Sequence, residues 1–109
     1  WYIIRANARR FNREYCTSAE MESFFATSHI CEYCKISEEE WFKKYKTKLE
    51  IDRKNANRGY TLNNIVWACH WCNVIKSNLL TYQEMKEIGL KYIKPKWNKI
   101  IDYNPKKRK

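Results

Sequence analysis

The sequence has few of the residues that build flexible or membrane-crossing segments. Of its 109 residues, 2 are glycine and 2 are proline, which leaves little room for linkers or low-complexity stretches. No apolar run approaches the ~20 residues that cross a bilayer, and no secretory signal peptide is visible. We therefore expect one domain with no membrane partner, in the cytoplasm and not secreted.

Acidic residues are in the minority. The chain has 22 lysines and arginines against 12 aspartates and glutamates, a formal charge of +10. Residues 91–109 hold eight basic residues and one acidic residue, a net charge of +7. Such a stretch is either a solvated tail or a contact for phosphate backbones, and the two are compatible. The charge predicts a nucleic-acid partner, with Lys106, Lys107 and Arg108 as candidate contacts.

Four of the five cysteines form two C-x2-C pairs, Cys31 with Cys34 and Cys69 with Cys72. Two such pairs supply the four thiolates of a tetrahedral zinc site and would tie distant segments together. Disulfides are the alternative, but a two-residue gap does not suit pairing within a knuckle, and there is no secretory signal. The spacing therefore predicts a structural zinc ion, with Cys16 left as an ordinary thiol.

Capping residues and apolar spacing predict a small, mainly helical α+β domain. Capping boxes at Thr17–Glu20, Ser37–Glu40 and Thr81–Glu84 each open a helix, and the last helix is expected to end at Gly89. We also expect helices over 2–15 and 69–78, a strand over 48–53, and a second strand or an extended loop over 60–67. The predicted organisation is N-terminal helices over 1–30, a zinc-containing core over 31–90 and a basic extension over 91–109.

Asp52 and Asn73 are candidate ligands of a second metal. Asp52 ends the first expected strand, and Asn73 follows Cys72 in the first turn of a helix. If the strand packs on that helix, both side-chain oxygens converge on one hard cation, Mg²⁺ or Mn²⁺. Such a cation can stabilise the transition state of phosphodiester hydrolysis. Taken singly each residue is weak evidence, since an Asp after a strand usually forms a turn.

A long motif resembles the HNH (ββα-metal, His-Me finger) endonucleases. It reads Ile51-Asp-Arg-Lys, then Arg-Gly-Tyr-Thr-Leu-Asn-Asn-Ile-Val-Trp-Ala, then Cys69-His-Trp-Cys-Asn-Val-Ile-Lys-Ser-Asn78. The likeness begins near Cys31 and runs to Met85, and it is nearest to rare-cutting type II restriction enzymes and small phage proteins of this family. It implies a treble-clef-like ββα-metal core that hydrolyses double-stranded DNA in a bacterial or phage-infected cell.

The resemblance also assigns roles to residues. Asp52 and Asn73 match the two ligands of the catalytic cation, and Asn64 matches the asparagine that supports the loop and orients the catalytic strand. Arg53 stands where most members have the general-base histidine, and an arginine cannot accept a proton from water. The rare-cutting type also has arginine there, and Tyr60 matches its loop tyrosine. Tyr60 could accept the proton, position the water while a substrate phosphate accepts it, or merely pack beside the turn glycine.

Three further basic residues are candidate nucleic-acid contacts: Lys54 at the strand end, His70 in the second knuckle and Lys76 one turn after Asn73. The rival interpretation is a catalytically silent nucleic-acid-binding module, which the missing histidine favours. A zinc-containing protein-interaction domain ranks last because it leaves the Asp-Asn spacing and the charge unexplained. Cutting both strands would need a homodimer or two sequential nicks.

Overall fold

The computed structural model describes residues 14–101, and for residues 99–101 it describes the backbone alone. The helix expected over 2–15 and the candidate contacts Lys106, Lys107 and Arg108 fall almost wholly outside this part of the chain. Among the described residues, no helix combines the length and the apolar character needed to span a bilayer.

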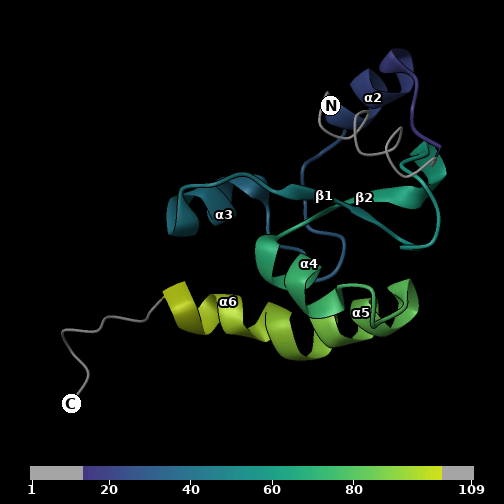
Figure 1. Ribbon diagram of the computed structural model, residues 1–109. Coiled ribbons are helices and arrows are strands. Elements are labelled where there is room, and N and C mark those ends of the chain that lie inside the picture. The colour runs from purple at the N-terminus through teal and green to yellow at the C-terminus, as the bar shows by residue number, and fades with distance from the viewer. Residues whose placement is uncertain (1–13, 102–109) are drawn as a thin grey trace.

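A two-stranded antiparallel sheet lies at the centre of the molecule (Figure 1). It pairs β1 (Glu50–Arg53) with β2 (Ile65–Ala68), and Asp52 lies opposite Val66. All four side chains of β2 are buried, which fits a strand covered on both faces. Most of residues 60–67, where a second strand or an extended loop is expected, form a loop. The short turn η1 (Leu62–Asn64) leads from this loop into β2.

Helices surround this sheet, with α4 directly beneath it and a long helical stretch below α4 (Figure 1). Thr17 and Thr81 form full capping boxes, as the sequence predicts, and Ser37 accepts a hydrogen bond from the Glu40 backbone N–H. The helices are α2 (Ser18–Phe25), α3 (Glu38–Tyr45), α4 (His70–Lys76), α5 (Tyr82–Ile88) and α6 (Lys94–Ile101).

Gly89 is the C-cap of α5, as predicted, but α5 is not the last helix. Gly89 is helical, with φ −60° and ψ −45°, and the chain continues through the π-helical turn η2 (Gly89–Ile93) into α6. The glycine serves close packing, because a Cβ there would lie 2.5 Å from the Tyr33 backbone carbonyl. A left-handed conformation is not needed.

The core extends further along the chain than predicted. Ile93 and Trp97 are buried, and the Trp97 ring meets Trp41 edge to face with centroids 6.1 Å apart. Residues of the expected basic extension, Ile93 and Trp97, therefore pack with the core of the domain. The basic residues of this stretch share a helix with core residues.

Candidate active site

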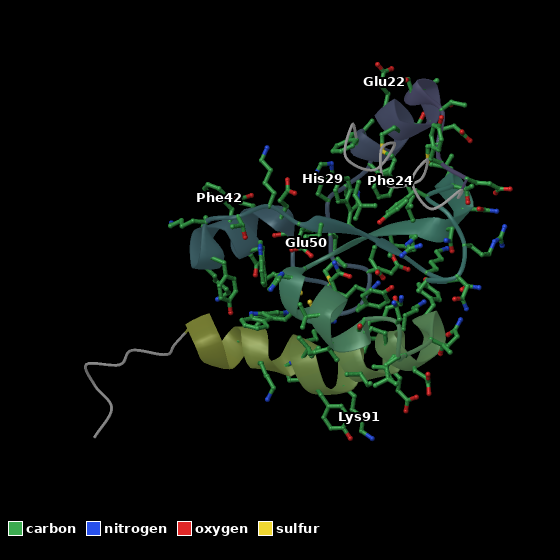
Figure 2. All side chains as sticks on the ribbon, in the orientation of Figure 1. Glu22, Phe24, His29, Phe42, Glu50 and Lys91 are labelled. Atoms are coloured by element: carbon green, nitrogen blue, oxygen red, sulfur yellow. The ribbon has the colours of Figure 1, made fainter. Side chains whose placement is uncertain are left out.

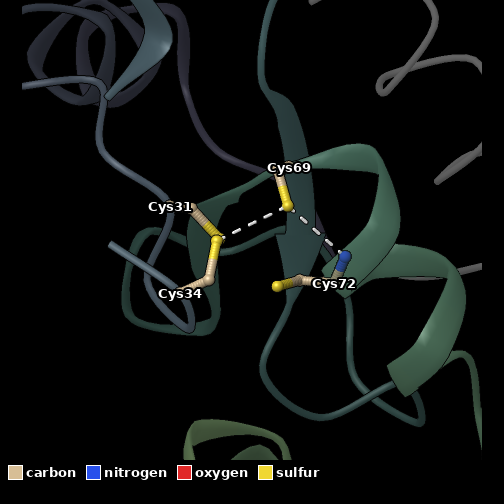
Figure 3. Close-up of side chains that lie close together, drawn as sticks. All are labelled: Cys31, Cys34, Cys69 and Cys72. Atoms are coloured by element: carbon tan, nitrogen blue, oxygen red, sulfur yellow. Dashed lines mark hydrogen bonds between the residues drawn. The ribbon is translucent and has the colours of Figure 1, made fainter. Parts of the chain in front are cut away.

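Two C-x2-C segments bring four cysteine side chains together (Figure 3). Cys31 and Cys34 lie in the loop before α3, Cys69 is the N-cap of α4, and Cys72 is in its first turn. The four sulfurs lie within 4.8 Å of one another, and all four side chains are fully buried. The cluster is positioned to bind a metal, and its all-thiolate donor set has the composition of a structural zinc site.

The four thiols lie close enough to shift one another's pKa values. Hydrogen bonds from the other three thiols hold the pKa of Cys31 well below its usual range, and the same coupling raises the pKa of Cys72. One thiolate therefore forms readily in the cluster, and thiolate is the form that coordinates metal. Cys16 is buried elsewhere, where desolvation and the nearby Glu20 raise the pKa of its thiol.

Asp52 and Asn73 line one small polar hollow of about 130 Å³ between β1 and α4. The strand and the helix meet as the sequence argument requires, so that both residues line the same hollow. Arg53 and Tyr60, also predicted as site residues, line the same hollow. The full lining is Ile51, Asp52, Arg53, Ala56, Tyr60, Asn73, Ser77 and Asn78.

The Asp52 carboxylate is held by two groups in the protein interior, Tyr33 and Lys76. It is 8% exposed, and its Oδ2 accepts a 2.6 Å hydrogen bond from the Tyr33 hydroxyl. The same oxygen lies 3.5 Å from the Lys76 ammonium. Desolvation raises the pKa of Asp52, while the Tyr33 hydrogen bond and the Lys76 charge oppose that shift.

Asn73 is oriented by a second acidic residue, Glu50. The Asn73 amide nitrogen donates to Glu50 Oε1 at 2.7 Å, and the other Glu50 oxygen lies 2.9 Å from His70 Nδ1. Figure 2 shows Glu50 on β1, close to the start of α4. Because the nitrogen of the amide is engaged, its oxygen is the atom left for a cation.

Asn64 holds the loop between the two strands. Its side-chain oxygen accepts from the Asn55 backbone N–H at 3.0 Å, and its amide nitrogen donates to the carbonyls of Asn55 and Gly59 at 3.1 and 2.8 Å. The side chain is buried. It thus cross-links residues 55–59, the segment that leads from Asp52 to Tyr60.

Tyr60 and Arg53 lie against each other at one side of the hollow. The guanidinium carbon of Arg53 is 5.0 Å from the centroid of the Tyr60 ring, and Nη1 donates to the Arg58 carbonyl at 3.0 Å. The Tyr60 backbone bonds to Glu14 O at 2.8 Å and to Cys16 N at 2.7 Å. A Cβ at Gly59 would lie 2.0 Å from that Glu14 oxygen, so only glycine allows this approach.

Comparison with known proteins supports the likeness to HNH endonucleases. No protein-family model matches the chain, and none of the curated proteins is significantly similar to it. Among solved structures, the rare-cutting HNH restriction endonuclease PacI superposes with a TM-score of 0.81 and 29% sequence identity. The match covers 92% of this chain and 78% of PacI, whose structure was described for an extraordinary mechanism of DNA perturbation. The chain has the HNH fold, and this match supports its assignment to the HNH endonuclease family.

The burial of Lys76 corrects one expectation about this HNH core. We expected Lys76, one turn after Asn73, to contact a backbone phosphate, but it is 1% exposed. Its ammonium donates to the Arg53 carbonyl at 2.8 Å and pairs with Asp52. Lys76 is therefore an internal partner of the HNH site and is not placed to reach nucleic acid.

The two other predicted contacts within residues 14–101, His70 and Lys54, are not fully buried. His70 is half-exposed at the start of α4, where it bonds to Glu50. The Lys54 ammonium lies 5.1 Å from the centroid of the Tyr82 ring.

Sequence reasoning missed two residues of the HNH site, Tyr33 and Glu50. Glu50 had a usable signal: it lies two residues before Asp52 on a strand, so both side chains face the same side of the sheet. Tyr33 had none, because it reads as an ordinary residue inside a C-x2-C knuckle. Only the packing of the knuckle against β1 brings its hydroxyl to Asp52.

Proposed function

We propose that the protein is a metal-dependent endonuclease that hydrolyses DNA phosphodiester bonds, with Asp52 and Asn73 holding one Mg²⁺ or Mn²⁺. The observation that carries the proposal is the shared hollow, in which a carboxylate and an amide oxygen are both available. Oxygen donors of this kind suit hard cations. The family relationship and the charge of +10 support DNA as the substrate.

The residues around the hollow divide the chemistry among them. When bound, the cation supplies charge stabilisation for the phosphate oxygens in the transition state. Arg53 stays protonated, so it can bind a phosphate oxygen but cannot take the proton of the attacking water. Tyr60, in contact with Arg53, orients that water or accepts its proton. The four cysteines hold a separate structural zinc ion.

Tyr60→Phe separates the possible roles of that tyrosine. Loss of cleavage with DNA affinity retained supports the phenol as the group that orients or deprotonates the water. Unchanged cleavage would reduce Tyr60 to a packing residue and leave a substrate phosphate as the proton acceptor. Arg53→Lys is a useful companion because it keeps the charge and loses the planar contact with the ring.

The partner we propose is double-stranded DNA in the cytoplasm of a bacterial or phage-infected cell. A single Asp52–Asn73 site in the chain suits cleavage of one strand. Cutting both strands then takes a homodimer or two sequential nicks, and the ratio of nicked to linear plasmid over time distinguishes the two.

The direct test is cleavage of supercoiled plasmid with Mg²⁺ or Mn²⁺, using Asp52→Ala as the control. We expect nicked or linear product with the parent protein and none with the variant. Equal cleavage by both would indicate a contaminating nuclease, and no cleavage of any DNA by the parent would contradict the proposal. The second candidate, a silent binding module, is favoured by Arg53; it predicts salt-dependent DNA binding without cleavage.

A further inference from the structure

Tyr33 is a buried residue with an unusual position. It lies between the two cysteines of the first knuckle, it is 0% exposed, and its ring meets Tyr82 with centroids 6.0 Å apart. Its hydroxyl reaches 19 residues along the chain to donate to Asp52 Oδ2 at 2.6 Å. A buried phenol needs such a partner, but the partner here is the proposed ligand of the catalytic cation.

The same carboxylate oxygen has a second neighbour. Lys76 Nζ lies 3.5 Å from Asp52 Oδ2 and is itself fixed by a 2.8 Å hydrogen bond to the Arg53 carbonyl. Oδ2 thus faces two donors from the protein interior. The other carboxylate oxygen, Oδ1, has no such partner among the described residues.

We propose that Tyr33 is a positioning residue that engages Oδ2 of Asp52, so that this carboxylate presents Oδ1 alone to the cation. The inference rests on the proposed metal-binding role of Asp52. A carboxylate held by a neighbouring hydroxyl has its rotation fixed before the metal arrives, which lowers the entropic cost of binding.

The position of Tyr33 joins the two metal sites. Cys31 and Cys34 fix its backbone on either side, and Gly89 packs directly against its carbonyl. The first knuckle therefore sets the place of the hydroxyl as well as holding two thiolates. In this arrangement the structural site determines which face of Asp52 is free.

Tyr33→Phe tests the inference. Tyr82→Phe is the matched control, because the Tyr82 hydroxyl also donates to a carboxylate, that of the partly buried Glu32. Binding of Mn²⁺ to the zinc-loaded proteins is measured by electron paramagnetic resonance of free Mn²⁺. We expect Kd for Mn²⁺ to rise by about 10-fold or more in Tyr33→Phe, the usual effect of removing a partner behind a metal ligand. Tyr82→Phe should stay within about twofold.

A second variant covers the case in which Tyr33→Phe does not fold or take up zinc. In Lys76→Met the hydroxyl of Tyr33 is the remaining donor to Oδ2 and a nearby positive charge is gone, so we expect Mn²⁺ to bind at least as tightly as in the parent. Unchanged Mn²⁺ binding in folded Tyr33→Phe, or a tenfold loss in Lys76→Met, would overturn the inference. If the parent binds no Mn²⁺, or binds it no better than Asp52→Ala, the proposed function fails instead.

Discussion

The polar side chains buried around the hollow each have a specific partner. Asp52 and Lys76 pair with each other, and Asn64 makes three hydrogen bonds to the backbone of the loop that carries Tyr60. A buried polar group left without its partner costs more free energy than a typical intramolecular hydrogen bond contributes net to stability. These side chains therefore fix the backbone on both sides of the hollow.

Asn64→Ala should lower the free energy of unfolding by about 1–3 kcal/mol, because two backbone carbonyls and one N–H lose a buried partner. Asn63 is the matched control: it is exposed, and its side chain accepts only from the Thr61 hydroxyl. We expect Asn63→Ala to change the stability by less than about 0.5 kcal/mol. Urea unfolding measures both, and equal effects would contradict the loop-holding role of Asn64.

Glu50→Ala should lower the cleavage rate by about 10-fold or more, because the Asn73 amide loses the acceptor that orients it. The control is Glu39→Ala, whose carboxylate pairs with Lys43 on the exposed face of α3. A single-turnover cleavage assay compares the two variants. An unchanged rate in Glu50→Ala would mean that α4 positions Asn73 without help.

At the scale of elements, the helical stretch α5–η2–α6 is placed by contact with the first knuckle. Gly89 lies where a side chain would meet the Tyr33 backbone, and the turn η2 carries Ile93 into the core. Pro95 follows just after this turn, where its missing N–H and its ring would disturb a regular helix. A wider turn at this point lets the helix continue past the proline.

Gly89→Ala gives a prediction whose sign opposes helix propensity. In an open helix, alanine is more favourable than glycine by about 1 kcal/mol. Here the new Cβ would lie 2.5 Å from backbone atoms of Tyr33, so we expect a loss of about 1–3 kcal/mol. Lys91→Ala, at an exposed position in η2, is the control and should be nearly neutral. A stabilised Gly89→Ala protein in urea unfolding would refute the close contact.

The elements that the sequence predicts are those that local patterns determine. The capping boxes at Thr17 and Thr81 and the two cysteine pairs each depend on residues three positions apart. The strand pair and the helix after Cys69 follow from short apolar runs next to turn residues. The role of Gly89, the burial of Lys76 and the partner of Tyr33 depend on segments far apart in the sequence. A lysine near a helix end or a glycine after a helix looks the same locally in either role.

At the scale of the whole molecule, the cysteine cluster joins the segment before α3 to the N-terminus of α4. Tyr33, within the first knuckle, and Ile36, just after it, are part of the core. The hollow lies between β1 and α4, the helix whose N-cap is Cys69. A bound metal would close a loop of roughly 35 residues and so restrict the unfolded chain. The fold of this small domain should therefore depend on the metal.

Removing zinc with a strong chelator should abolish the cooperative unfolding transition. Circular dichroism monitors the unfolding, and the metal content is measured in parallel. Before chelation, iodoacetamide should modify none of the cysteines in the folded protein, since all five are buried and the pKa of Cys16 is raised. After chelation, mass spectrometry should find all five cysteines modified, because loss of the fold exposes Cys16 as well. A metal-free protein with unchanged unfolding would contradict the structural role of the cluster.

The central claim is that Asp52 and Asn73 hold one catalytic cation between them, and a double-mutant comparison of cleavage rates tests it most directly. Single-turnover rates on plasmid DNA are measured in Mg²⁺ for the parent, Asp52→Ala, Asn73→Ala and the double variant. Each single variant should lose at least about 100-fold, and the double variant should be no slower than the worse single one, because both remove the same ion. Losses that multiply in the double variant, or a single variant that cleaves at the parent rate, would contradict the claim.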